Sequence, residues 1–363
     1  MAWIAWDYQE YAAYIKKSGP MSASANLLQA NLKPYHAKGV NKPPRLFITY
    51  YSMPDWLDIF TFEGFDLQKT PFASMVGRYK QSVQKHQKEV GDLLDQIVST
   101  KSGQALLTEV CSTRFKVFVM PYYHYFKTMP GMNFFNAVTR PIMPTEKLFH
   151  ISDGTVPNYE AAYERNAPLR DDDGNQLDGQ KGMGTGANVA LFFSAEIFET
   201  NNAPTEGAGF KSDEVLFHEL VHVTRMFRGH MTSAPVDGPA NFGNIEEYLA
   251  TVISNIYISE KGPGQPPLRG FYRVTPNVRR VTRADGTVKR IVEPLPPNAN
   301  VMTDPDHFAF KAGANLLPRE LMDVFQNTQK DFYSALAHLP KEKPKFNPAG
   351  QHLRGEDDDR IPI

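Results

Sequence analysis

The residues best suited to chemistry stand in the stretch VLFHELVHVTRMFRG, residues 215–229. His218 and His222 are four positions apart, and Glu219 directly follows the first histidine. Residues four apart on an α-helix lie on one face, so both imidazoles can reach the same ion. A glutamate beside them can polarise a water molecule on that ion, and this H-E-x-x-H order is typical of zinc metallopeptidases.

The flanking residues predict that this stretch is a single helix over residues 213–228. Ser212 is a favourable N-cap, and the acidic residues after it suit the positive end of the helix dipole. Arg225 and Arg228 stand in the last turn, and Gly229 suits the left-handed conformation that ends many helices. A core helix with two hydrogen-bonded histidines is the alternative. The glutamate at the required position, together with both helix ends, favours the metal site.

A catalytic zinc site normally has three protein ligands and one open position, so a third ligand must be found. The metzincin pattern would place glycine at 225 and histidine at 228, and both positions are arginine, which excludes that class. His230 comes two residues late for this pattern and is a disfavoured candidate. Asp237, in the following loop, would be the ligand in an aspartate-type site.

The favoured third ligand stands in a second predicted helix, GNIEEYLATVISNIYISE, residues 243–260. Its apolar residues form one stripe, with Glu246 at the edge of that stripe and Glu247 opposite, in line with small residues. Small residues suit a face that another helix approaches closely. We therefore predict Glu247 as the third ligand, with Glu246 as its supporting neighbour or the alternative ligand. Two solvent-facing glutamates would be the non-functional interpretation.

These residues predict hydrolysis with one Zn²⁺ per chain. The metal would lower the pKa of its water toward 7, and Glu219 would take the proton and pass it to the leaving nitrogen. Tyr272 is our candidate for stabilising the oxyanion, with Arg269 as its partner or as the partner of the second glutamate. His307 is another candidate, although all three residues also fit structural roles. The alternative function is a zinc-containing binding or structural module without hydrolytic activity.

Composition narrows the classes of partner. The chain has 363 residues, 41% of them hydrophobic, and a formal net charge of −1. Such a balance gives no field that would attract nucleic acid or an anionic membrane. The single cysteine, Cys111, ends an apolar run and is expected to be a small buried side chain. Because we see neither a classical signal peptide nor a long apolar span, we expect a soluble protein.

The hydrophobic pattern predicts an α+β, zincin-like fold that is mostly helical with a small sheet. We expect a mainly helical N-terminal region over residues 1–98, packed on a metallopeptidase domain over 99–340. A polar, extended or disordered tail is expected over 341–363. The expected elements are a helix within 72–100, a helix over 102–110 with Ser102 as N-cap, a strand ending near Pro121, a strand over 189–194, a hairpin around Asp285-Gly286, and one helix over 317–339. Residues 127–185 otherwise read as loop-rich.

Four segments together resemble the effector-type zinc metallopeptidases. They cover roughly residues 100–270 in family order: SGQALLTEV, GMGTGANVALFF, VLFHELVHVTRMFRG, and NIEEYLATVISNIYISEKG followed by LRG. That family includes a MAP-kinase-cleaving type III effector and the metallopeptidase domains of VgrG-type and RHS-repeat toxins. The family tends to have Glu-Glu, two residues and then Thr, whereas Thr251 comes one residue later, so the choice of glutamate stays open.

The resemblance has implications for both the site and the biological role. It implies a gluzincin-like site with a glutamate ligand from the second helix, consistent with Glu247, and a protein substrate. It also implies an effector or toxin exported by a specialised secretion system into another cell. A secretion-system component or an immunity protein would then be a partner.

Overall fold

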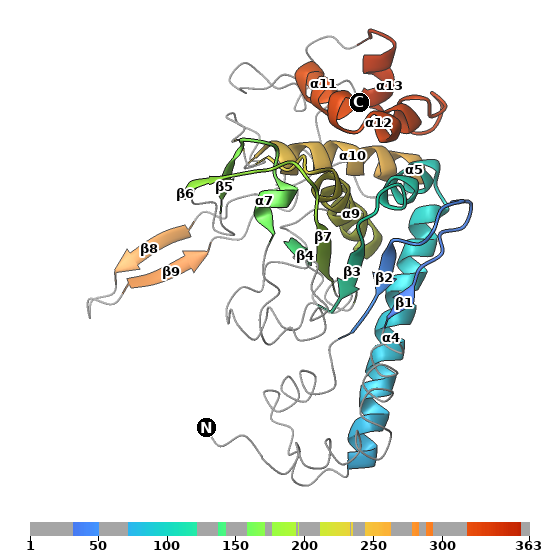
Figure 1. Cartoon of the computed structure of the whole chain (residues 1–363), viewed down its shortest axis with the longest axis vertical. Coiled ribbons are helices and arrows are strands. Elements are labelled where there is room, and N and C mark those ends of the chain that lie inside the picture. Colours follow the sequence, from blue (N-terminus) through green and yellow to red (C-terminus); the bar gives the residue numbers. More distant parts are fainter. Residues whose placement is uncertain are drawn as a thin grey trace.

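The computed structural model describes part of the chain. The described residues are 32–50, 72–121, 137–142, 158–170, 176–193, 195, 211–232, 234, 244–262, 278–282, 288–292 and 318–356. Within them, helices and a small mixed sheet form an α+β fold, as predicted (Figure 1). No helix in these ranges is long and apolar enough to cross a membrane.

The sheet has five strands in the order β1-β2-β3-β7-β4. Strands β2, β3 and β7 are parallel, and the two outer strands pair antiparallel to them. The bounds are β1 Lys33–Pro34, β2 Leu46–Ile48, β3 Val117–Met120, β4 Ala137–Ile142 and β7 Asn188–Phe193. The central strands VFVM and NVALFF are almost continuously buried, as expected for parallel strands covered on both faces. Both were predicted from their apolar runs.

Eight helices and two hairpin-like strand pairs complete the described elements. The helices are α4 Phe72–Val98, α5 Lys101–Val110, α7 Tyr159–Ala162, α9 Ser212–Arg228, α10 Ile245–Lys261, α11 Pro318–Thr328, α12 Lys330–Ala337 and α13 Pro348–Leu353. The strand pairs are β5 Pro168–Arg170 with β6 Gln176–Lys181, and β8 Val278–Thr282 with β9 Val288–Val292. The second pair confirms the predicted hairpin strands, while Asp285 and Gly286 lie outside the described residues.

Helix α9 is the central element of the fold. It packs against α4, α5 and α10 and against strands β4 and β7. All its residues from Asp213 to Phe227 are buried, so the helix is covered on every side. It begins one residue earlier than predicted, with Lys211 as N-cap, and it ends as predicted at Gly229, whose φ is 69°.

Three local predictions were wrong because tertiary contacts prevailed. The N-cap of α5 is Thr100, whose hydroxyl accepts from the Gly103 amide; Ser102 instead donates its hydroxyl to Glu260. The single helix predicted over 317–339 is interrupted at Gln329, whose side chain reaches α9. The expected extended tail contains α13, preceded by the buried ring of Phe346.

Two further observations concern the packing around the sheet. Cys111 is buried, as predicted for a small apolar side chain. Strand β4 lies in the region that we expected to be loop-rich, and its sequence AVTRPI has no regular alternation. Proline is tolerated there because β4 is at the edge of the sheet among the described strands.

Candidate metal centre

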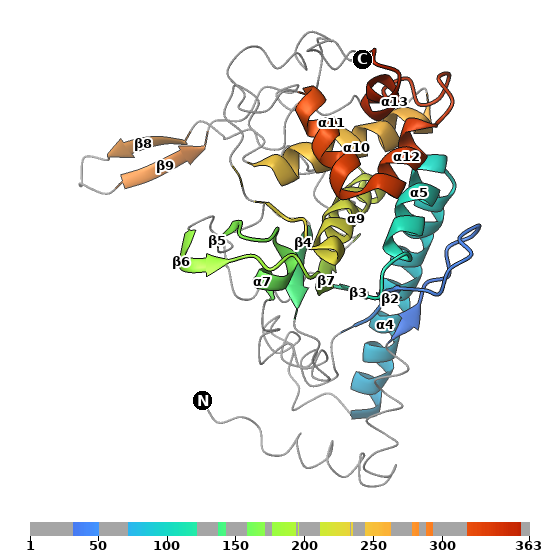
Figure 2. The same ribbon diagram turned by 45° about the horizontal axis from the view of Figure 1, so that its top comes forward.

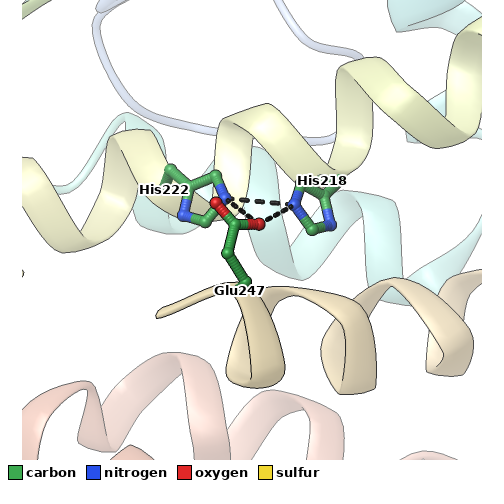
Figure 3. A group of neighbouring side chains, drawn as sticks. All are labelled: His218, His222 and Glu247. Atoms are coloured by element: carbon green, nitrogen blue, oxygen red, sulfur yellow. Dashed lines mark hydrogen bonds and ion pairs between the residues drawn. The ribbon is translucent and has the colours of Figure 1, made fainter. Parts of the chain in front are cut away.

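Helices α9 and α10 bring two imidazoles and one carboxylate to a single point (Figure 3). The Nε2 atoms of His218 and His222 are 3.0 Å apart. Oε2 of Glu247 lies 3.2 Å from the first of these atoms and 3.4 Å from the second. One donor atom from each residue therefore lies within 4.8 Å of the others.

Local structure explains this convergence. His218 and His222 lie one turn apart on α9, so their rings emerge from one face. Glu247 is in the first turn of α10, where the side chain of the N-cap residue Asn244 accepts from its backbone amide at 2.9 Å. The histidine rings are buried, while 21% of the Glu247 side chain remains exposed. Glu247 is therefore the most exposed of these three side chains.

The electrostatics of the cluster favour a cation. Burial disfavours a charged His222, but the Glu247 carboxylate outweighs this effect and raises the pKa of the imidazole to about 9. Burial also disfavours a charged Glu247, but His222 and His218 hold the pKa of its carboxyl well below the usual range. Since metal binding needs neutral imidazole, a divalent ion would replace the proton held here.

The donor atoms fit zinc. Two imidazole nitrogens and one carboxylate oxygen form a ligand set that catalytic zinc sites use, with one coordination position left open. The Ser254 hydroxyl donates to the Ala250 carbonyl at 2.7 Å and lies 3.5 Å from Nδ1 of His218. The hydroxyl oxygen can thus accept from Nδ1–H, which leaves the lone pair of Nε2 facing the cluster, as in many metal-ligating histidines.

Glu219 lies beside this cluster and is held by the sheet. Its carboxylate Oε2 accepts a hydrogen bond from the hydroxyl of Thr139 on β4. The side chain is buried, and burial raises the pKa of its carboxyl against the opposing effects of His222 and Thr139. A buried carboxylate with a raised pKa is suited to accept a proton in catalysis.

The structure separates the two neighbouring glutamates. The Glu246 carboxylate lies against Arg225, whose Nε is 2.8 Å from Oε1 and 2.6 Å from Oε2. The backbone amide of Thr232 also donates to Oε1, at 3.0 Å. Glu246 therefore faces a buried guanidinium, and Glu247 faces the histidines.

The remaining predicted candidates do not join the described cluster. His230 follows the end of α9, and burial, aided by Arg225 and Arg228, lowers its pKa to about 4. It is not among the described residues that gather their donor atoms at this point.

Four other candidates cannot be placed. Asp237, Arg269, Tyr272 and His307 lie outside the described residues. The role of Tyr272 in stabilising an oxyanion thus stays a prediction.

Three residues of the site were not predicted in their present roles. Ser254 could have been found, because it stands seven residues after Glu247 and hence on the same helix face. Arg225 could also have been found, because it stands three residues after His222 and shares its face. Thr139 offers no local signal, since its strand lacks a regular pattern and only the fold brings it to Glu219.

The part of the chain that contains this site is similar to a known protein family. The family model Peptidase_M91, described as "Effector protein", matches residues 76–252. This match, which covers just under half of the chain, supports the predicted resemblance to the effector-type metallopeptidases. It extends from α4 into α10 and includes both histidines, Glu219 and Glu247. Comparison with curated proteins and with solved structures gives no match.

The match to Peptidase_M91 ends at residue 252, before the last three described helices. Helices α11, α12 and α13 follow residue 252 and hence lie outside the matched region. Within the described residues, α11 nevertheless packs against α10, and α12 packs against α5 (Figure 2). Helices that the family model does not cover thus pack against the matched region.

Proposed function

We propose that the protein is a zinc-dependent metallopeptidase that hydrolyses peptide bonds of a protein substrate. The observation that carries this proposal is the convergence of His218, His222 and Glu247 beside Glu219. The three residues would hold one zinc ion per chain. A helix that carries H-E-x-x-H, packed between a mixed sheet and a second ligand helix, supports a zincin-like arrangement.

In this proposal, several residues of the chain have distinct roles in hydrolysis. When bound, zinc supplies Lewis-acid chemistry that acidifies a water molecule and polarises the substrate carbonyl. Glu219 takes the proton that the attacking water loses, holds it on its buried carboxylate, and passes it to the leaving nitrogen. Thr139 holds Oε2 of this glutamate, which leaves Oε1 for proton transfer. Tyr272 remains our candidate donor to the oxyanion.

A structural zinc module is the second candidate, and the ligand set argues against it. Structural zinc sites have four protein ligands, whereas catalytic sites keep one position open. The described residues place three potential ligands at this point, and the side chain of Glu247 is partly exposed. These observations favour a site at which a substrate can bind.

We further infer that the peptidase acts as an exported effector or toxin. The support is the description of the M91 family as an effector protein. A secretion-system component or an immunity protein would then be a natural partner, in addition to the substrate.

The decisive experiment separates metal binding from hydrolysis. Elemental analysis of the purified wild type should give one zinc per chain, and Glu219→Gln should retain it while His218→Ala loses it. The wild type and Glu219→Gln are then produced in bacterial cytoplasm and periplasm, and new protein termini are identified by proteomics. We expect new termini with the wild type alone. Zinc in both proteins without new termini in either compartment would favour the structural module.

A further inference from the structure

Arg225 lies on the same face of α9 as the two histidines. Positions 218, 222 and 225 are separated by four and three residues, so their side chains form one row along the helix. The guanidinium group is fully buried, although the sequence indicates only a last-turn cation. A buried charge needs several partners, and all of those found for Arg225 lie close to the ligand helices.

The partners of Arg225 come from three parts of the chain. Its Nε donates to both carboxylate oxygens of Glu246, at 2.8 and 2.6 Å. Its Nη1 donates to the hydroxyl of Thr328 at 3.0 Å, and its Nη2 donates to the carbonyl of His230. The ion pair between Arg225 and Glu246 is buried, with side-chain exposures of 0% and 3%. This network joins the end of α9 to the start of α10 and to the end of α11.

A second contact joins the junction between α11 and α12 to α9. Gln329, at the break between α11 and α12, donates its side-chain amide to the Thr224 hydroxyl at 2.8 Å. Thr328 and Gln329 thus hold two consecutive residues of α9, directly after the turn that carries His222. The break in the predicted helix has a physical reason, because it turns both side chains toward the ligand helix.

Glu246 and Glu247 are consecutive, so their side chains leave α10 in directions about 100° apart. When Glu246 is held by Arg225, the direction of Glu247 follows. The N-cap residue Asn244 fixes the same turn from its other end. The first turn of α10 is therefore anchored on both sides of the residue that faces the histidines.

We propose that Arg225, Glu246, Thr328 and Gln329 form a buttress that aims Glu247 at His218 and His222. These four are positioning residues and do not contact the metal. The proposal rests on the metal-binding part of the proposed function and needs no knowledge of the substrate. It also makes the C-terminal helices, outside the M91 match, part of the support of the metal site.

The competing explanation is that these four residues stabilise the fold without positioning Glu247. A second buried acid that pairs with an arginine of α9 allows the two explanations to be separated. Glu109 accepts from Nε of Arg228 at 2.9 Å, and its side chain is 3% exposed. Both acids pair with an arginine in the last turn of α9, but Glu109 belongs to α5 and has no ligand as neighbour. Glu109→Gln is hence the matched control for Glu246→Gln.

The test measures metal affinity on the full chain by titration with Co²⁺, together with the visible absorption spectrum of the bound ion and thermal unfolding of the apoprotein. We expect Glu246→Gln to weaken Co²⁺ binding by about 10–100-fold and to alter the spectrum. Glu109→Gln should lower stability but keep the wild-type affinity and spectrum. Thr328→Val should weaken binding less than Glu246→Gln does.

Failure of the buttress proposal and failure of the proposed metal site would give different results. A folded Glu246→Gln protein with wild-type affinity and spectrum would overturn the buttress, as would equal weakening by Glu109→Gln. If Glu246→Gln does not fold, Thr328→Val decides: weaker Co²⁺ binding supports the buttress, and wild-type binding overturns it. Wild-type Co²⁺ affinity in His218→Ala would instead reject the proposed metal site.

Discussion

Thr139 on the edge strand β4 donates a hydrogen bond to the carboxylate of Glu219 on α9. The two residues are 80 positions apart in the chain, and the bond ties the proposed base to the sheet. His218, which precedes Glu219 in the sequence, faces Glu247 and His222 instead. The proposed base is therefore positioned by the sheet, whereas the proposed ligands are positioned by helices.

We expect Thr139→Val to lower kcat by about 10-fold or more, because a hydrogen bond to a charged group is worth about 1.5–3 kcal/mol. Thr139→Ser keeps the hydroxyl and should restore most of the rate. Zinc content should be the same in all three proteins, since Thr139 does not face the cluster. The measurement is steady-state kinetics on a cleaved peptide, and an unchanged kcat in Thr139→Val would remove this residue from the positioning of the base.

Zinc should stabilise the folded protein through the two ligand helices. A ligand that binds only the native state at 100 times its dissociation constant adds about 2.7 kcal/mol to the free energy of unfolding. We expect this gain when zinc is added to the chelator-treated wild type, measured by urea denaturation. Glu247→Gln and His222→Ala should show little or none of it. An equal gain in either variant would place the zinc elsewhere.

His86 on α4 should make the protein sensitive to acid. Its ring packs edge-on against Tyr50 and donates to the Val119 carbonyl at 3.4 Å, and burial lowers its pKa from 6.5 to about 4. Between these values the unfolded chain binds more protons than the native one, so stability falls as the pH drops from about 6.5 toward 4. This single group should cost about 3 kcal/mol over that interval.

The variant His86→Gln tests this sign directly. The difference between the wild-type and variant unfolding free energies, measured from pH 7 to pH 4, isolates the contribution of this histidine. Exposed His338 provides the control, since His338→Gln should follow the wild-type curve. Parallel curves for the wild type and His86→Gln would contradict the prediction.

The end of α9 should not tolerate a side chain at Gly229. Its φ of 69° is in the left-handed region, and an added Cβ would lie 2.4 Å from the carbonyl carbon of Gly184. We expect Gly229→Ala to cost about 2–5 kcal/mol, from backbone strain together with overpacking. Gly355 has a φ of 65° with open space around it, so Gly355→Ala should cost only the strain, about 1–2 kcal/mol. Thermal or urea unfolding compares them, and equal losses would exclude the close contact as a cause.

Local patterns in the sequence predicted several elements of this fold. The central strands β3 and β7 are short apolar runs, and α4, α9 and α10 have helical periodicity over many turns. Spacing alone placed His218, Glu219 and His222 on one helix, because four residues make about one turn. The left-handed end at Gly229 was also readable, since glycine is the residue that adopts this conformation without strain.

Contacts between distant segments decided the rest. Gln329 interrupts a continuous helical pattern, and Phe346 anchors a segment whose composition suggests an extended tail. These features depend on surfaces that other helices supply, so no local pattern contains them.

Glu246 and Glu247 show most clearly how local sequence and helix packing each contribute to the site. Their sequence, Glu246-Glu247, states only that two carboxylates leave α10 in different directions. Packing of α9 against α10 decides that one meets the guanidinium of Arg225 and the other meets two imidazoles. The sequence by itself determined the helices and the types of donor atom, because these follow from local periodicity and side-chain chemistry. Only the tertiary structure decided which carboxylate faces which partner, because that depends on the rotation of one helix relative to another.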